Sequence, residues 1–194
     1  MSSNEKKGKI LILVSPSGGG KSTMTKKLLK NFDNIKFSVS ATTRNPRPGE
    51  KNGVHYFFLD DDEFEKRIEK NDFLEWEEFY NGTKYGTLRS HVEKELNKGY
   101  FILLDIDVLG ALNVKKLYGN RALTIFIAPP SLAVLEKRLR ARGTENDKTL
   151  KTRLERARKE MEYMNDFDVT VINDKLESAY KEIQKSVSTF IHNR

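Results

Sequence analysis

Cysteine is absent from the 194 residues, and its absence excludes two classes of site. Without thiols the chain can form no disulfide framework and no thiolate metal site. Histidine is scarce as well, with three in the whole chain, so the sequence offers no obvious general base.

Long apolar runs are also missing. The opening stretch, MSSNEKKGK, is polar and is followed by an apolar run of strand length only. This pattern predicts neither a signal peptide nor a membrane anchor, so we expect a cytoplasmic protein with no membrane partner. Internal repeats and low-complexity segments are not evident, and the length is enough for one domain with an inserted lobe.

Positive charge is in excess, with 35 Lys+Arg against 28 Asp+Glu and a formal net charge of +7. Such a surface suits an anionic partner, either a nucleic acid or a small polyphosphate. No stretch resembles an RNA-recognition motif, a zinc finger or a KH domain, so no nucleic-acid partner is expected. Many basic residues alternate with glutamates on expected helices, and much of the charge is therefore interpreted as solvated surface.

Short apolar runs alternate with helical patterns along most of the chain. Because strands that alternate with helices form right-handed crossovers, this order predicts an α/β fold with a five-stranded parallel sheet flanked by helices. The expected strands lie at 9–15, 35–40, 101–107, 122–128 and 168–174. The expected helices lie at 22–31, 88–98, 131–142, 147–165 and 175–191.

Residues 41–87 interrupt this alternation. NPRPGEKNG is typical of a loop, DDEFEKRIEKN predicts a helix, and VHYFFL, LEWEEFY and TKYG predict short strands of a small antiparallel or mixed sheet. We interpret this region as a lobe inserted between the second and third core strands. A second excursion, the polar and arginine-rich segment 140–149, is interpreted as a mobile lid.

The stretch SPSGGGKST, residues 15–23, nearly matches the phosphate-loop pattern G-x-x-x-x-G-K-[ST]. Gly20, Lys21 and Ser22 fit the pattern, whereas Ser15 stands at its first position. The backbone N–H groups of residues 18–23 would form the phosphate cradle at the start of a helix. Ser15 lies where the strand ends, so it is expected to be a tolerated variant. The alternative is an ordinary glycine-rich turn with a chance lysine, and the strand–loop–helix context disfavours it.

Acidic residues end the apolar strand FILLDID. Asp105 is in phase to lie beside Ser22 and to help hold Mg²⁺, directly or through water, and Asp107 follows where the strand opens into the cleft. The alternative is that both acids belong to an exposed turn.

Arginines form two further groups. Arg44 and Arg47 lie three residues apart on a proline-containing loop, a rigid arrangement that suits bidentate phosphate binding. Arg138 and Arg142 lie on one expected helix and Arg153 on the next, where a closing lid would bring them to a transferring phosphoryl group. For each arginine taken alone, an exposed surface position is the competing interpretation.

Together these motifs resemble the guanylate kinase family. The matching strings are PSGGGKST, SVSATTRNPRPGEKNGVHYFF, FLEWEEFYNGTKYGT, LLDIDVLGA, RLRARGT with TRLERA, and FDVTVIND, and they span most of the chain in the family's order. The resemblance implies one domain with a P-loop NTPase-type core, a small α+β GMP-binding lobe and a short lid. The core is expected at about 1–40, 88–137 and 155–194, the lobe at about 41–87, and the lid at about 138–154.

The resemblance also implies roles for individual residues. Glu75 would read guanine, because a carboxylate has two acceptors for the N1–H and 2-amino donors; Glu77 has the same strand parity, so alternation alone does not choose between them. The implied catalytic residues are Lys21, Arg44, Arg138, Arg142 and Arg153, and the implied metal ligands are Ser22 and Asp105. The implied ATP-binding residues are Ser15, Pro16, Ser17, Gly18, Gly19, Gly20, Lys21, Ser22, Thr23, Arg142 and Asn173, with Asn173 near the adenine. The implied GMP-binding residues are Ser40, Arg44, Arg47, Glu50, Tyr56, Glu75, Tyr85, Gly86, Thr87, Asp105 and Asp107.

The activity that the resemblance implies is phosphorylation of GMP, and of dGMP, by ATP with Mg²⁺ in purine nucleotide metabolism. A phosphate oxygen is already ionised at neutral pH, so no general base is needed. One departure is the lid segment TENDKTLKTR, which lacks the family's commoner acidic residues, and no role is assigned to Glu145 or Asp147. Two other classes stay open: a non-catalytic guanylate-kinase-like module that binds proteins, and a nucleic-acid binder. The protein is expected to be a monomer or a homo-oligomer.

Overall fold

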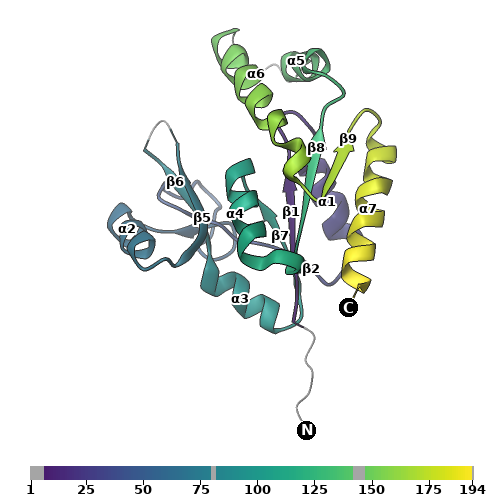
Figure 1. Ribbon diagram of the computed structural model, residues 1–194. Helices are drawn as coiled ribbons and strands as arrows, with labels where there is room; N and C mark the ends of the chain where they lie inside the picture. The colour runs from purple at the N-terminus through teal and green to yellow at the C-terminus, as the bar shows by residue number, and fades with distance from the viewer. Residues whose placement is uncertain (1–6, 80–81, 142–146, 194) are drawn as a thin grey trace.

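The computed structural model, which describes residues 7–79, 82–141 and 147–193, contains two sheets (Figure 1). The larger one is a five-stranded parallel sheet in the order β2-β7-β1-β8-β9. Its presence confirms the predicted fold class, and each strand lies inside its predicted range. The strands are β1 (Ile10–Val14), β2 (Ile35–Phe37), β7 (Phe101–Asp105), β8 (Ala122–Ala128) and β9 (Val169–Ile172).

Both faces of this sheet are buried, which explains the unbroken apolar runs in its strands. Alternate side chains of β1 belong to two separate clusters: Ile10 and Ile12 join the cluster with α3 (Arg89–Asn97) and α4 (Val108–Tyr118), while Leu11 and Leu13 join the other. That second cluster is completed by α1 (Lys21–Asn31) and α7 (Leu176–His192). The sheet is therefore the middle layer of three.

Helix α4 is an addition to the predicted elements. It packs against β1 and β8 of the large sheet and against β5 (Phe73–Glu78) of the small one. The segment VLGALNVKKLY lacks a clear helical pattern because apolar side chains lie on both faces: Ala111 and Val114 are buried, whereas Leu109 and Leu117 are each 56% exposed. Its N-terminus is nevertheless marked by Asp107, whose side chain accepts a hydrogen bond from the Gly110 N–H.

The small sheet lies to one side of the core (Figure 1) and all its strands come between β2 and β7 in the chain. Its order is β4-β3-β6-β5, with β3 and β4 parallel and the other neighbours antiparallel. The three aromatic-rich runs form strands as predicted, whereas β3 lies in a stretch for which no strand was predicted. Besides β5, the elements are β3 (Ala41–Thr42), β4 (Phe57–Phe58), β6 (Lys84–Leu88) and the helix α2 (Asp61–Glu69).

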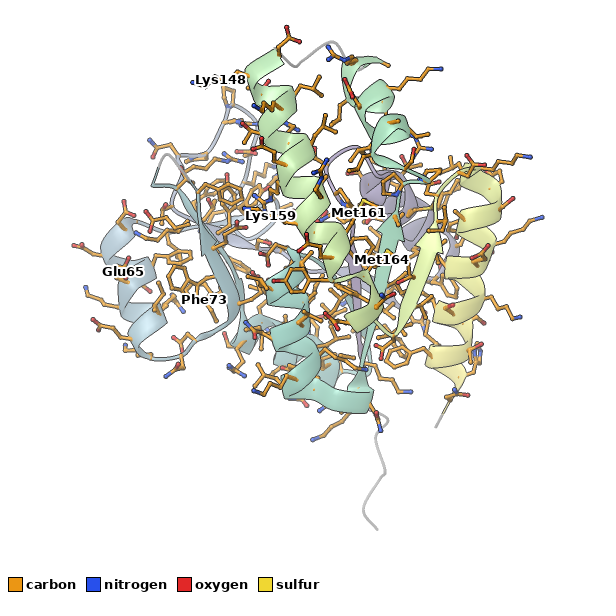
Figure 2. The ribbon with its side chains drawn as sticks, turned by 45° about the horizontal axis from the view of Figure 1, so that its top comes forward. Glu65, Phe73, Lys148, Lys159, Met161 and Met164 are labelled. Carbon is orange, nitrogen blue, oxygen red and sulfur yellow. The ribbon has the colours of Figure 1, made fainter. Side chains whose placement is uncertain are left out.

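Helices α5 (Leu132–Ala141) and α6 (Asp147–Glu162) pack together through their own apolar cluster, which includes Leu135, Leu139 and Leu150. In Figure 2, α6 runs from Lys148 towards Lys159; Met161 near its end and Met164 just after it pack against the core of the large sheet. The helix is shorter than the predicted 147–165 because the chain tightens into a 3₁₀ turn at Met164–Asp166. A second 3₁₀ turn, Gly119–Arg121, follows α4. In the described ranges, no helix has the length and apolar character needed to span a bilayer.

Replacing Phe64 with alanine is expected to destabilise the small sheet. The Phe64 ring is fully buried and stacks on Phe73 with the ring centroids 4.4 Å apart. Removing a large aromatic side chain from such a core costs about 3–5 kcal/mol of unfolding free energy, measurable by denaturant titration. Trp76→Ala, in the same sheet but at a side chain that is 45% exposed, is the control and should change stability far less. A loss below about 1 kcal/mol for Phe64→Ala would contradict the packing described.

Candidate active site

A cleft of about 1350 Å³ lies at the carboxyl ends of the parallel strands, bounded by the small sheet and by α6. This is the edge where ligands bind in open parallel sheets. The structure brings together predicted residues from segments that lie far apart in the sequence. Predicted residues that line the cleft are Ser15, Pro16, Ser17, Gly18, Gly20, Lys21, Ser22, Thr23, Ser40, Tyr56, Glu75, Tyr85, Gly86, Asp105, Asp107, Arg138 and Arg153.

Several predicted site residues do not line the cleft. They are Gly19, Arg44, Arg47, Glu50, Thr87 and Asn173. Among them, Arg44 pairs with Glu50, Thr87 donates to Glu75, and Asn173 donates to Gly19. Arg142 lies outside the described residues.

The loop between β1 and α1 has the geometry of an anion cradle. Gly18 has φ +88° and Gly20 has φ +108°, values that favour glycine. Gly20 is the N-terminal cap of α1 and carries no side chain to cover the first N–H groups of the helix. These groups and the helix dipole favour a negative charge at this place.

Ser15 has an ordinary backbone, because Asn71 is the one non-glycine residue with positive φ in the described part of the chain. Its hydroxyl donates to the Pro16 carbonyl at 3.0 Å. A Cβ at Gly19 would lie 2.0 Å from the Ser15 Oγ, so the serine fits the loop only beside glycine. The sequence argument, that a small residue with ordinary φ is tolerated here, agrees with this conformation.

Lys21 and Asp105 form an ion pair between the start of α1 and the end of β7. Ser22 follows Lys21 in the first turn of the helix, and all three residues line the cleft. A hydroxyl and a carboxylate are oxygen donors of the kind that Mg²⁺ prefers. Across ranges 7–79, 82–141 and 147–193, no group of three or more His, Cys, Asp or Glu side chains could hold a metal. A divalent cation here would therefore need further ligands from a bound phosphate or from water.

Glu75 lies at the other end of the cleft, on the same side of β5 as Glu77. The Thr87 hydroxyl donates to the Glu75 carboxylate at 2.6 Å. Burial raises the pKa of Glu75 to about 7; the Thr87 bond opposes this rise, and the nearby charges of Asp107 and Glu77 add to it. The stability that protonated Glu75 contributes is present below its ordinary pKa of 4.5 and is lost as the pH rises through about 7.

The arginine loop is organised by Glu50. Its carboxylate accepts two hydrogen bonds of 2.7 Å from the Arg44 guanidinium and one of 2.7 Å from the Arg47 backbone N–H. The pairing raises the pKa of Arg44 above its ordinary value and lowers that of Glu50 to about 2. The Arg44 guanidinium also lies 4.9 Å from the centre of the Tyr56 ring and near Tyr85. Glu50 thus fixes Arg44 beside Tyr56 and Tyr85, two residues that line the cleft.

The remaining described arginines of the prediction contact the phosphate loop or its support. Arg153 of α6 donates to the Ser17 Oγ at 2.7 Å. Arg138 of α5 donates to the Asn173 carbonyl at 2.8 Å, and the Asn173 side chain donates to the Gly19 carbonyl at 2.7 Å. The geometry therefore gathers Arg138 and Arg153 around the loop and places Asn173 behind it.

The sequence analysis missed three charged residues of the cleft: Lys148, Arg156 and Glu160. Arg156 of α6 lies 3.4 Å from Glu77 and 2.8 Å from Glu160, so it links the helix to the small sheet. Arg156 follows Arg153 by three residues, one helical turn; this spacing was the signal that could have placed both on the cleft face. The cleft also includes Val14, Phe37, His55, Phe79, Ile106, Val108, Lys148, Thr149 and Thr152.

Known proteins share this arrangement of elements. Residues 7–190 match the family model described as guanylate kinase. The chain is 48% identical over 187 residues to a guanylate kinase of Chlorobium chlorochromatii, covering 96% of this chain and 98% of that protein. It is 47% identical over 185 residues to one of Bacteroides thetaiotaomicron, covering 95% and 91%. It is also similar to the crystal structure of guanylate kinase from Anaplasma phagocytophilum, with TM-score 0.73, 32% identity, and coverage of 97% and 89%.

Removing the Thr87 hydroxyl is expected to raise the pKa of Glu75 further. The hydroxyl stabilises the ionised carboxylate by donating to it, and valine keeps the shape of the side chain without the donor. A carboxyl ¹³C NMR titration of Thr87→Val should therefore show a midpoint above that of the unaltered protein. Thr87→Ser retains the hydroxyl and is the matched control. A midpoint in Thr87→Val that is unchanged or lower would contradict the assigned bond.

Proposed function

The chain belongs to the guanylate kinase family, and from this premise we propose that its cleft transfers the γ-phosphoryl group of ATP to GMP, forming ADP and GDP. The observation that carries the proposal is the pairing of two features in one cleft. A phosphate loop with Lys21 lies at one end, and the partly buried carboxyl of Glu75 lies at the other. We assign ATP to the first end and GMP to the second.

At the ATP end, the loop would hold the phosphates by backbone N–H groups and by the start of α1. Lys21 lines the cleft, and in this proposal its charge would act on the transferring phosphate. Arg153 contacts the loop through Ser17, and Arg138 lines the same end of the cleft. Together these cations would stabilise negative charge that spreads over the phosphate oxygens as the bond to ADP breaks.

At the GMP end, Glu75 would accept hydrogen bonds from N1–H and from the 2-amino group of guanine. Adenine has neither donor and would leave the carboxylate unpaired, which is how a polar pocket becomes selective. Arg44 is held by Glu50 close to Tyr56 and Tyr85, an arrangement suited to the GMP phosphate. A preorganised guanidinium loses little freedom when a phosphate binds.

Magnesium is the metal that the donor set fits, with the Ser22 hydroxyl and the Asp105 carboxylate as the protein ligands, Asp105 directly or through water. When bound with ATP it would supply positive charge to the phosphate oxygens. The attacking oxygen belongs to the GMP phosphate and needs no base, so the residues of this chain bind, orient and exclude water. Arg153 and Arg156 of α6 bond to the phosphate loop and to the small sheet, and would help to close the cleft.

The non-catalytic protein-binding module is disfavoured, because the relatives compared are guanylate kinases and the loop and its lysine are intact. Use of dGMP, a place in purine nucleotide metabolism, a cytoplasmic location and a monomeric or homo-oligomeric state stay predictions. The division into a core, a GMP lobe at about 41–87 and a lid at about 138–154 also stays a proposal, as do the roles of the individual site residues.

The activity can be tested by coupling ADP release to NADH oxidation, with Mg²⁺, ATP and GMP as reactants. We expect turnover that requires GMP and is not supported by AMP. Lys21→Ala, prepared in the same way, should lose on the order of 10²-fold or more in kcat while still binding GMP, which excludes a contaminating kinase. If the unaltered protein forms no ADP when GMP is added, or if Lys21→Ala turns over normally, the proposal is wrong.

Replacing Glu75 with glutamine should weaken GMP binding and leave ATP binding unchanged. Glutamine keeps the shape but offers one acceptor and two donors, so one guanine donor is mispaired, at a cost of about 1–3 kcal/mol. The KM for GMP and the Kd from calorimetry should both rise. Glu77→Gln is the matched control, since Glu77 lies on the same side of β5 and pairs with Arg156. If GMP affinity falls in Glu77→Gln and not in Glu75→Gln, the residue that reads guanine is Glu77 and the assignment to Glu75 is wrong.

A further inference from the structure

Asn173 lies just after β9 and behind the phosphate loop, with 5% of its surface exposed. Its backbone N–H donates to the Ala128 carbonyl at the end of β8 at 2.7 Å. Its side-chain Nδ2 donates to the Gly19 carbonyl, also at 2.7 Å. The large sheet thus fixes the position of Asn173, and Asn173 in turn holds one peptide of the loop.

The held peptide joins Gly19 to Gly20. A trans peptide is planar, so its C=O and N–H groups point in opposite directions. With the Gly19 carbonyl bonded to Asn173, the Gly20 N–H points away from Asn173. Gly20 lines the cleft whereas Gly19 does not, so this orientation turns the Gly20 N–H towards the cleft, where a phosphate oxygen would accept it.

The orientation of a peptide between two glycines depends on such a hydrogen bond more than that of other peptides does. Without Cβ atoms, both signs of φ are accessible, and the intervening peptide can turn over with little steric resistance. If it turned over, the carbonyl would face the cleft and repel a phosphate. The fit is also close, since a Cβ at Gly20 would lie 2.3 Å from the Asn173 Nδ2.

Asn173 has a second partner that belongs to the cleft. The Arg138 guanidinium donates to the Asn173 carbonyl at 2.8 Å and to the Asp174 carbonyl at 3.4 Å. One buried residue therefore supports both a loop peptide and an arginine that lines the cleft.

We propose that Asn173 is a positioning residue of the phosphate loop, which orients the Gly19–Gly20 peptide so that the Gly20 N–H faces the phosphates. This inference rests on the proposed function, in which the loop holds the phosphates of ATP. It differs from the role implied by the family resemblance, a contact near the adenine. The two roles make opposite predictions for a ligand that has phosphates and no base.

The test measures the Kd of ATP and of inorganic tripolyphosphate by calorimetry, for the unaltered protein and for Asn173→Ala. A positioning role predicts that the variant binds both ligands more weakly by a similar factor, about tenfold, the scale of one buried hydrogen bond. An adenine contact predicts a loss for ATP alone. Loss for ATP alone, no loss for either ligand, or no tripolyphosphate binding by the unaltered protein would each overturn the inference.

Asn173→Asp gives a second readout that a general loss of packing would not produce. Its ionised carboxylate would face the Gly19 carbonyl with no proton to donate, while the protonated carboxyl could donate an O–H to it. Relative to the unaltered protein at the same pH, tripolyphosphate affinity should therefore recover as the pH falls. A ratio that is constant with pH would contradict the assigned bond, and this variant serves equally if Asn173→Ala fails to fold.

Two controls separate this inference from the proposed function. Asn165→Ala changes an exposed asparagine in the 3₁₀ turn before β9 and should leave both affinities unaltered. GMP affinity should be unchanged in Asn173→Ala, because Glu75 and Arg44 lie in the small sheet and its adjoining loop. Absence of GMP-dependent turnover in the unaltered protein would refute the kinase, whereas equal tripolyphosphate binding with and without Asn173 would refute only the positioning role.

Discussion

The pairing of β1 with strands on both sides is the interaction on which the rest of the cleft depends. β1 is the central strand, bonded in parallel to β7 and to β8. In this register Leu13 lies opposite Asp105, so the acid at the end of β7 comes level with the start of the phosphate loop. The ion pair between Asp105 and Lys21 follows from that alignment. A shift of one residue would also turn each side chain of β1 to the opposite face of the sheet, so burial on both faces fixes the register.

Around this edge, the cations that would meet phosphate are each held by another group of the protein. Glu50 holds Arg44, two backbone carbonyls hold Arg138, and Ser17 accepts a bond from Arg153. Flexible side chains lose rotamer freedom when they bind a ligand. When these cationic side chains are already held in the folded protein, their rotamer freedom is lost during folding instead of during binding. The apolar clusters of the large and the small sheet supply the stability that offsets this loss.

The five parallel strands and most helices could be predicted because burial on both faces leaves continuous apolar runs, and one-sided burial leaves a helical period. The same logic explains the miss at α4, where Leu109 and Leu117 lie on the exposed face and obscure the helical period. At β3 the strand is two residues long, too short for any period. Motifs indicated residues that lie together at one cleft, but most contacts between distant segments could not be predicted. Arg156 and Glu77 are 79 residues apart, and Asn173 and Gly19 are 154 apart, so their contacts depend on the assembled fold.

Gly110, in the first turn of α4, shows how an absent side chain shapes the pocket. A Cβ there would lie 2.8 Å from the Asp107 Oδ1 and 3.2 Å from the Glu75 Cγ. Alanine would favour the helix by about 1 kcal/mol, yet it would press on both the capping carboxylate and the carboxylate at the base of the cleft. Every substitution that a single base change can make at a glycine codon adds at least this atom. Gly110 therefore leaves room for the Asp107 and Glu75 side chains, and the shape of the pocket depends partly on a residue that has no functional group.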